Sequence, residues 1–279
     1  MPKEATYTIE EKTSILHTER ETCCTILLGK TYLTYVYTSV TLDKVYLVKH
    51  FDIRKTALGK TDFDEILYDL FIKKSKSYRI GIDTYKNLLL PTIIDSKDCL
   101  KLFESMYETF IDETIQYDII DNEKKIYYAI DTQIKKLLTS STIDIKCFNS
   151  GTALLKTYPS VLNSNKKVVA FVSIKDEIGM LSVYEDKNLL LHQTYPFLTP
   201  TDILYQLLSI KKNKINDQEM MVYLHGENNS VTQTYDLLKN YFKQVSYLPR
   251  IQNIEYPEDI EKVPAHFFYN VFSLATCEL

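Results

Sequence analysis

The stretch TDFDEILYDLFIKKSK at residues 61–76 recurs, in altered form, as TPTDILYQLLSIKKNK at residues 199–214. Both copies open with a threonine three residues before an aspartate, which is typical of a capped helix start. Pro200 strengthens the second start, because the N–H that proline lacks has no partner in the first helical turn. Both copies end in a lysine run, and positive charge is favourable at the C-terminus of a helix. We therefore predict one structural unit that occurs twice.

Apolar segments rich in β-branched and aromatic residues surround each copy of the repeat and predict strands. Three strands precede each copy, at Thr22–Leu28, Tyr32–Tyr37 and Lys44–Phe51 in the first half and at Lys166–Ile174, Gly179–Tyr184 and Asn188–Pro196 in the second. One strand follows each copy, at Tyr78–Ile82, with Asn87–Leu90 as its continuation, and at Met220–His225.

A helix with one apolar stripe is expected after each of these later strands. The first helix begins near Asp95. It is expected to bury either Cys99 or Leu100, then Phe103, then either Met106 or Tyr107, and finally Phe110. The second helix begins near Asn229 and is expected to bury Val231, Tyr235, Leu238 and Phe242. Between the halves we expect strands at Ile126–Ile130 and Ile143–Phe148, helices at Gln133–Leu138 and Thr152–Tyr158, and a polar crossing at Ser160–Lys167.

Two domains follow from this order of elements, at residues 1–162 and 163–279. The chain ends in an apolar helix after Pro264 that includes Phe268 and Phe272. Because this helix belongs to the second stretch of the chain, we expect it to pack on the second half.

Three strands followed by a helix, a strand and a helix, all occurring twice, resemble the layout of the actin-like ATPase superfamily. In that superfamily two ribonuclease-H-like halves face each other across a nucleotide cleft. Several segments also resemble the domain of unknown function 3822 family of uncharacterised bacterial proteins: LLLPTIID at 88–95, Tyr195-Pro196-Phe197, Tyr223-x-x-Gly226 and Cys277-Glu278-Leu279. The resemblance implies an α/β fold of two duplicated halves, each a mixed sheet with an antiparallel three-strand meander and flanking helices, and it implies no assigned activity.

Composition is that of a globular protein, with 45% hydrophobic and 25% charged residues among 279. No apolar run reaches the roughly eighteen residues that a membrane-spanning helix needs, and Met1–Thr22 is too charged for a signal peptide. We expect a cytoplasmic protein without direct membrane insertion. The net charge of −4 is spread along the chain and forms no basic stripe, which argues against nucleic acid as a ligand.

Five cysteines without a C-x-x-C pair argue against a disulfide framework and a zinc site. The adjacent Cys23 and Cys24 are interpreted as packing residues. Two tripeptides, Gly29-Lys30-Thr31 and Gly59-Lys60-Thr61, mimic the end of a phosphate-binding Walker A loop. That loop requires a further glycine five positions earlier, where this chain has Cys24 and Arg54, so we interpret both tripeptides as turns.

If the fold is actin-like, the resemblance places the nucleotide among three turns, at residues 28–31, 175–179 and 225–228. Active relatives use an aspartate and glycines in the first two turns and consecutive glycines in the third. Here the first turn has no aspartate, the second has Asp176 but spaces Gly179 one residue too far, and the third has only Gly226. With six glycines in the whole chain, close backbone approaches to a polyphosphate are scarce.

Three functions remain open on the sequence alone. The first is a non-catalytic binding or scaffold protein with an unknown protein partner and no cofactor, for which 22 tyrosines suit an interface. The second is an ATPase or sugar-kinase-like phosphotransferase that uses ATP with magnesium. The third is a nucleotide sensor that binds without turnover. For the ATP-binding alternatives, the candidate site residues are Asp83, Asp176, Gly179 and Gly226.

Overall fold

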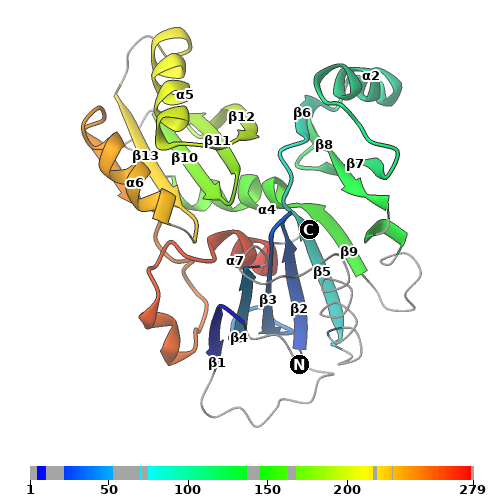
Figure 1. Cartoon of the computed structure of the whole chain (residues 1–279), viewed down its shortest axis with the longest axis vertical. Coiled ribbons are helices and arrows are strands. Elements are labelled where there is room, and N and C mark those ends of the chain that lie inside the picture. The colour runs from blue at the N-terminus through cyan, green and yellow to red at the C-terminus, as the bar shows by residue number, and fades with distance from the viewer. Residues whose placement is uncertain are drawn as a thin grey trace.

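The computed structural model describes residues 5–10, 22–52, 70, 75–132, 134–136, 145–162, 168–215, 219–227 and 229–277. The first copy of the repeat falls outside these residues apart from Leu70, Ser75 and Lys76, and the crossing Ser160–Lys167 falls outside them after Leu162. The described chain forms three sheets, with two large ones at the bottom and upper left of Figure 1 and a small one at the upper right. Among the described helices, none is both long and apolar enough to cross a lipid bilayer.

The first large sheet has the strand order β1-β4-β3-β2-β5-β9. The meander β2-β3-β4 is antiparallel, whereas β5 pairs parallel with β2 and β9 pairs parallel with β5. The strands are β1 (Tyr7–Glu10), β2 (Thr22–Leu28), β3 (Tyr32–Ser39), β4 (Val45–Asp52), β5 (Ser77–Ile82) and β9 (Ile145–Asn149).

The second large sheet repeats this topology in the order β12-β11-β10-β13-β14. Its meander β10-β11-β12 is antiparallel, β13 pairs parallel with β10, and β14 pairs parallel with β13. The strands are β10 (Val168–Lys175), β11 (Ile178–Glu185), β12 (Asn188–Pro196), β13 (Met220–His225) and β14 (Gln244–Tyr247). The predicted fold of two halves with one plan is therefore confirmed, although β1, β7 and β14 were not expected from the sequence.

Helix α5 (Pro200–Asn213) is the repeated helix of the second half. Its capping box joins Thr199 and Asp202, as the sequence predicts, and the lysines 211 and 212 lie in its last turn. Its buried face packs on the second sheet beside α6 (Asn229–Leu238). In the second half, the predicted helix and its caps are thus confirmed.

A small lobe is built from the sheet β6-β8-β7 and helix α2. Its elements are β6 (Asn87–Pro91), α2 (Ser96–Met106), β7 (Glu113–Ile119) and β8 (Lys124–Asp131). The expectation that Asn87–Leu90 continues β5 is wrong, because the chain turns away from the first sheet at Thr84. The side-chain amide of Asn87 donates a hydrogen bond to the carbonyl oxygen of Thr84 at 2.9 Å. A new sheet begins there (Figure 1).

The stripe predicted for α2 is shorter than expected. Cys99 and Phe103 are buried, but the helix ends at Met106, and both Met106 and Phe110 are exposed. The expectation that Phe110 is buried is therefore wrong, because a three-stranded sheet offers a helix only a short face to cover.

Helix α7 (Tyr269–Thr276) corrects a second expectation. It packs mainly against β2, β3 and β5 of the first sheet and against α4 (Ser150–Thr157), and it reaches the second half through fewer contacts such as Asn270 with Ser173 of β10. Phe272 lies in a buried cluster with Leu27 and Val36 of the first sheet. The physical reason is that the meander of the first sheet presents an apolar face that needs a cover. The domain division after residue 162 remains a prediction.

Arg79 of β5 holds the end of α7 in place. Its Nη1 donates hydrogen bonds to the carbonyl oxygens of Ala275 at 2.9 Å and Cys277 at 3.0 Å. These carbonyls lie at the C-terminal end of the helix. Carbonyl oxygens there have no N–H partner within the helix and carry partial negative charge. Two short 3₁₀ segments, η3 (Tyr158–Val161) and η4 (Glu258–Lys262), are also present.

The small lobe is joined to α4 through a buried carboxylate. Asp118 of β7 accepts hydrogen bonds from Asn149 N at 2.7 Å and from Thr152 Oγ1 at 2.6 Å, at the start of α4. Burial raises the pKa of Asp118 to about 6, although these hydrogen bonds act in the opposite direction.

We predict that Arg79→Ala lowers the free energy of unfolding by about 1–3 kcal/mol, because the carbonyls of α7 lose a charged donor. Urea denaturation measures the change. Lys146→Ala is the matched control, since Lys146 pairs with Arg79 across the strands but is exposed. If α7 were held by the second half instead, both variants would behave alike.

We predict that Asp118 makes stability depend on pH between about 4 and 6. A raised pKa means that the folded state binds the proton more tightly than the unfolded state, so this contribution is present below pH 4 and is lost as the pH rises to 6. Asp118→Asn should therefore gain about 2 kcal/mol relative to the wild type between pH 4 and pH 7. Urea melts of both proteins across this range measure the difference, and a constant difference contradicts the prediction.

Candidate functional site

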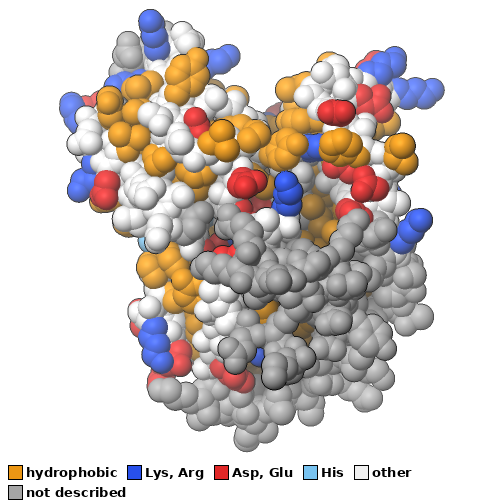
Figure 2. All heavy atoms as spheres, viewed as in Figure 1, with side chains coloured by type: hydrophobic (Ala, Val, Ile, Leu, Met, Phe, Trp, Pro, Cys, Tyr) orange, Lys and Arg blue, Asp and Glu red, His pale blue; other side chains and the backbone are white. Residues whose placement is uncertain are grey.

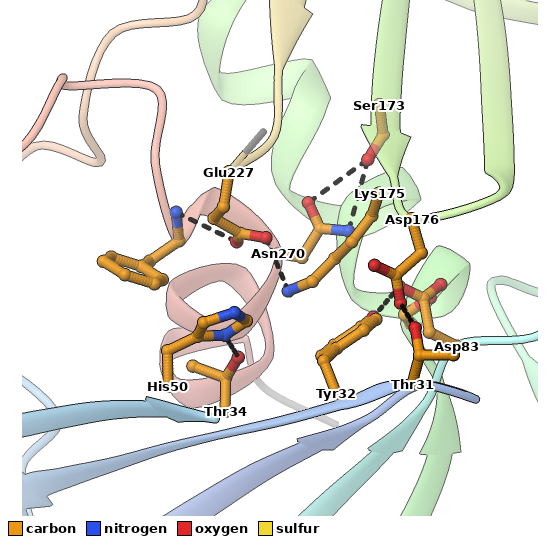
Figure 3. A network of polar contacts seen from close by, with 12 residues as sticks. Thr31, Tyr32, Thr34, His50, Asp83, Ser173, Lys175, Asp176, Glu227 and Asn270 are labelled. Carbon is orange, nitrogen blue, oxygen red and sulfur yellow. Dashed lines mark hydrogen bonds and ion pairs between the residues drawn. The ribbon is translucent and has the colours of Figure 1, made fainter. Parts of the chain in front are cut away.

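The turns between β2 and β3 and between β10 and β11 meet where the two large sheets adjoin (Figure 3). Thr31 of the first turn donates its hydroxyl hydrogen bond to the carboxylate of Asp176 in the second. Asp176 has a φ of 52°, a left-handed conformation that aspartate tolerates better than most residues. The equivalent turns of the two halves are thus joined directly to each other.

Tyr32, next along the first turn, is fully buried and donates a hydrogen bond to Asp83 at the end of β5. Asp83 also accepts a hydrogen bond from Ser150 Oγ at 2.7 Å. Burial, and then the negative charge of Asp83, raise the pKa of Tyr32 well above its ordinary value, so its phenol keeps the proton that it donates. A Cβ at Gly29 would lie 2.0 Å from the Tyr32 ring, so glycine there makes room for the ring.

Lys175 and Glu227 form a buried ion pair beside this tyrosine. Lys175 Nζ lies 2.8 Å from Glu227 Oε2, and only 4% and 5% of the two side chains are exposed. Lys175 Nζ also lies 4.1 Å from the centre of the Tyr32 ring, a cation–π contact. Glu227 Oε1 accepts a hydrogen bond from the backbone N–H of Phe268 at 3.1 Å. The two charges therefore neutralise each other within the protein, although neither Lys175 Nζ nor Glu227 Oε2 has a hydrogen-bond partner of good geometry.

The third turn packs against the protein's own backbone. Gly226 has a φ of 142°, and a Cβ there would lie 1.9 Å from the carbonyl oxygen of Ile174. Its N–H donates to the carbonyl of His266 at 3.3 Å. The one glycine of this turn thus allows the chain after β13 to pass close to the backbone of β10, where a larger residue would clash.

A buried aromatic and polar layer lies behind the ion pair. The Tyr158 hydroxyl and His225 Nε2 are 2.6 Å apart, and the Tyr158 ring stacks on Phe171 with centroids 4.1 Å apart. Burial lowers the pKa of His225 to about 3, so this imidazole is neutral. Ser173 and Asn270 hydrogen-bond each other between β10 and α7 at 3.2 Å. This layer has the character of a packed core.

Three of the four candidate site residues lie in this region. Asp83 and Asp176 contact the consecutive residues Tyr32 and Thr31, and Gly226 precedes Glu227. Gly179 does not belong to the group. A Cβ at Gly179 would lie 2.8 Å from the Tyr195 ring and 3.3 Å from Ile203, so its small size serves packing between the second sheet and α5.

The sequence did not single out Tyr32, Lys175 or Glu227. Lys175 and Glu227 do lie within the second and third of the turns considered for the nucleotide, and a lysine at the end of a buried strand was the available signal. Glu177 is exposed, and His225 belongs to the core. Among the described residues, no group of three or more histidine, cysteine, aspartate or glutamate residues is placed to hold a metal ion. Cys23 and Cys24 are both buried in β2.

Solved structures share this architecture. The chain is similar to a Bacteroides thetaiotaomicron protein with an actin-like ATPase fold and unknown function, with a TM-score of 0.79 and 16% identity over 95% of this chain and 100% of that one. It is also similar to a chain of the PilM–PilN type IV pilus biogenesis complex, with a TM-score of 0.60 and 11% identity over 91% of this chain and 97% of that one. At these identities the likeness shows the fold alone.

No curated protein matches the sequence. A family model described as protein of unknown function (DUF3822) matches residues 11–245, which is most of the chain. The chain therefore belongs to the DUF3822 family and has an actin-like ATPase fold.

Proposed function

We propose that this protein is a non-catalytic, actin-like binding or scaffold protein with a degenerate nucleotide cleft. The observation that carries the proposal is the ion pair of Lys175 and Glu227 beside the ring of Tyr32. These side chains lie among the three turns that hold the nucleotide in active members of the superfamily. In this chain the first two turns contact each other through Thr31 and Asp176, and Glu227 of the third contacts Lys175 of the second.

A polyphosphate does not fit this arrangement. Phosphate groups are bound by free cationic side chains, by exposed backbone N–H groups, or through a metal ion. Here Lys175 is already neutralised by Glu227. A phosphate replacing Glu227 at Lys175 would approach the carboxylates of Asp83 and Asp176 and leave Glu227 buried without its partner, which is costly.

The same contacts suit a rigid scaffold. They tie the first half to the second through Thr31 and Asp176, and Thr194 of β12 donates to the carbonyl of Tyr85 at 3.2 Å. The similarity to a chain of a pilus biogenesis complex supports a role in binding other proteins. A cytoplasmic location agrees with five cysteines that show no disulfide pattern.

One observation favours the ATP-binding alternative. Asp83 and Asp176 come from different halves and yet contact consecutive residues of one turn. If the ion pair of Lys175 and Glu227 opened, these two carboxylates could bind magnesium with ATP. The alternative therefore requires a second, open state of the protein.

We predict that millimolar Mg-ATP leaves the melting temperature unchanged and that no phosphate is released. A nucleotide present at a hundred times its dissociation constant would stabilise the folded state by about 2.7 kcal/mol, which a thermal melt detects. Magnesium alone is the control for ion effects. A shift that Asp176→Asn abolishes would overturn the proposal; phosphate release would then indicate an enzyme, and its absence a sensor.

We predict that Lys175→Met lowers the free energy of unfolding by about 3–5 kcal/mol, because it leaves Glu227 buried without its cation. Adding Glu227→Gln should recover part of this loss, since the amide still accepts the hydrogen bond from Phe268. Chemical denaturation of both variants gives the values.

The matched control for this pair is Lys243→Met. Lys243 and Glu219 form an ion pair of similar length, 2.6 Å, but both side chains are mostly exposed. Because water screens such a pair, its loss should leave stability nearly unchanged. Equal effects of Lys175→Met and Lys243→Met would contradict the view that the buried ion pair of Lys175 and Glu227 holds this junction together.

A further inference from the structure

The small lobe pairs three strands with a single helix. Three antiparallel strands are roughly 14 Å wide at about 4.8 Å each, whereas one helix is about 10 Å across, so α2 cannot cover the whole face. Through Cys99 and Phe103, α2 packs on a cluster that includes Tyr127 and Ala129 of the central strand β8. In the part of the chain that the structure describes, one edge of the sheet is therefore left without a helix.

The helix lies toward β6 and leaves β7 open. Tyr107, just after α2, donates a hydrogen bond to the carbonyl of Asn87 in β6 at 2.7 Å. With about 100° between successive helical residues, Leu102 and Met106 lie on one flank of α2, next to the buried Phe103. These two side chains are 43% and 60% exposed.

The apolar face of β7 continues beyond the helix. Ile115, Tyr117 and Ile119 alternate along β7 and share one face. Ile115 packs against the cluster beneath α2, but Tyr117 and Ile119 are 52% and 60% exposed. The Tyr117 ring lies 5.3 Å from that of Tyr127. We call Leu102, Met106, Tyr117 and Ile119 together the β7 face.

The lobe around the β7 face is acidic. Residues 87–131 contain ten aspartates and glutamates and four lysines, which gives a net charge of −6, whereas the whole chain carries −4. In Figure 2 the upper right lobe shows hydrophobic side chains next to Asp and Glu side chains. Anionic lipid and nucleic acid are repelled by such a charge, while a positively charged protein segment is attracted.

We propose that the β7 face is the docking site for a basic amphipathic helix of a partner protein. The apolar side of that helix would pack on Tyr117 and Ile119 beside α2, and its lysines or arginines would face the surrounding acids. The proposal deepens the scaffold function and rests on it for the existence of a partner. The partner's apolar and basic sides are inferred from the exposed apolar residues of β7 and from the negative net charge of the lobe.

The test uses the full chain and a fluorescent synthetic helix of about fifteen residues, with leucines on one side and lysines on the other. Fluorescence anisotropy at low salt should show saturable binding that weakens as salt is added. Tyr117→Ser with Ile119→Ser should weaken binding about ten-fold or more, because aromatic anchors dominate such interfaces. Met106→Lys provides a second variant on a helical position that tolerates lysine.

The matched control is Leu198→Ser with Tyr205→Ser, which removes one aliphatic and one tyrosine side chain from exposed positions of the second half. It should bind the peptide as the wild type does, and a peptide with glutamates in place of lysines should not bind. Circular dichroism melts of each variant establish that it is folded.

Three results would overturn the proposal: no saturable binding, equal weakening by the β7 and control variants, or a wild-type dimer in sedimentation that the β7 variants dissociate. The last result would assign the face to a second copy of the chain. Stabilisation by Mg-ATP with unchanged peptide binding would instead overturn only the proposed non-catalytic function, so the two failures are distinguishable.

Discussion

A buried cation, Lys175, occupies the point where the turns of the two halves meet, and the geometry of the junction follows from how its charge is neutralised. Glu227 supplies the opposite charge and Tyr32 the aromatic face, each within about 4 Å. Because an unpaired charge in this environment is costly, all three side chains hold one arrangement. That arrangement brings Asp83 and Asp176 against the first turn and leaves the turns in contact with each other.

The duplication explains why these groups meet at all. Both halves place the end of their first meander strand and the following turn at the same position of an equivalent sheet, so the two turns face each other across the junction. Among the described residues, α7 from the end of the chain packs on the first sheet, whereas α5 and α6 pack on the second.

Much of the fold could be predicted from local pattern. The strands β2 and β12 and the capped start of α5 agree with the sequence, because alternation, β-branching and capping act over a few residues. The errors concern partners that are distant in sequence: Asn87–Leu90 joins another sheet, Phe110 has no surface to pack on, and α7 crosses to the first half. Asp83, Asp176 and Gly226 were predicted as candidate site residues and lie together in this region, whereas Tyr32 was counted only as a strand residue.

The sequence by itself determined that one βα unit occurs twice and that its turns lack the glycines that polyphosphate binding exploits. Both properties depend on short stretches of consecutive residues, which a sequence pattern reveals directly. Only the tertiary structure decided which side chains meet between these turns. Lys175, Glu227 and Tyr32 are ordinary residues in their own segments, and their significance arises from burial and from charges brought together across 52 residues or more, which no local pattern encodes.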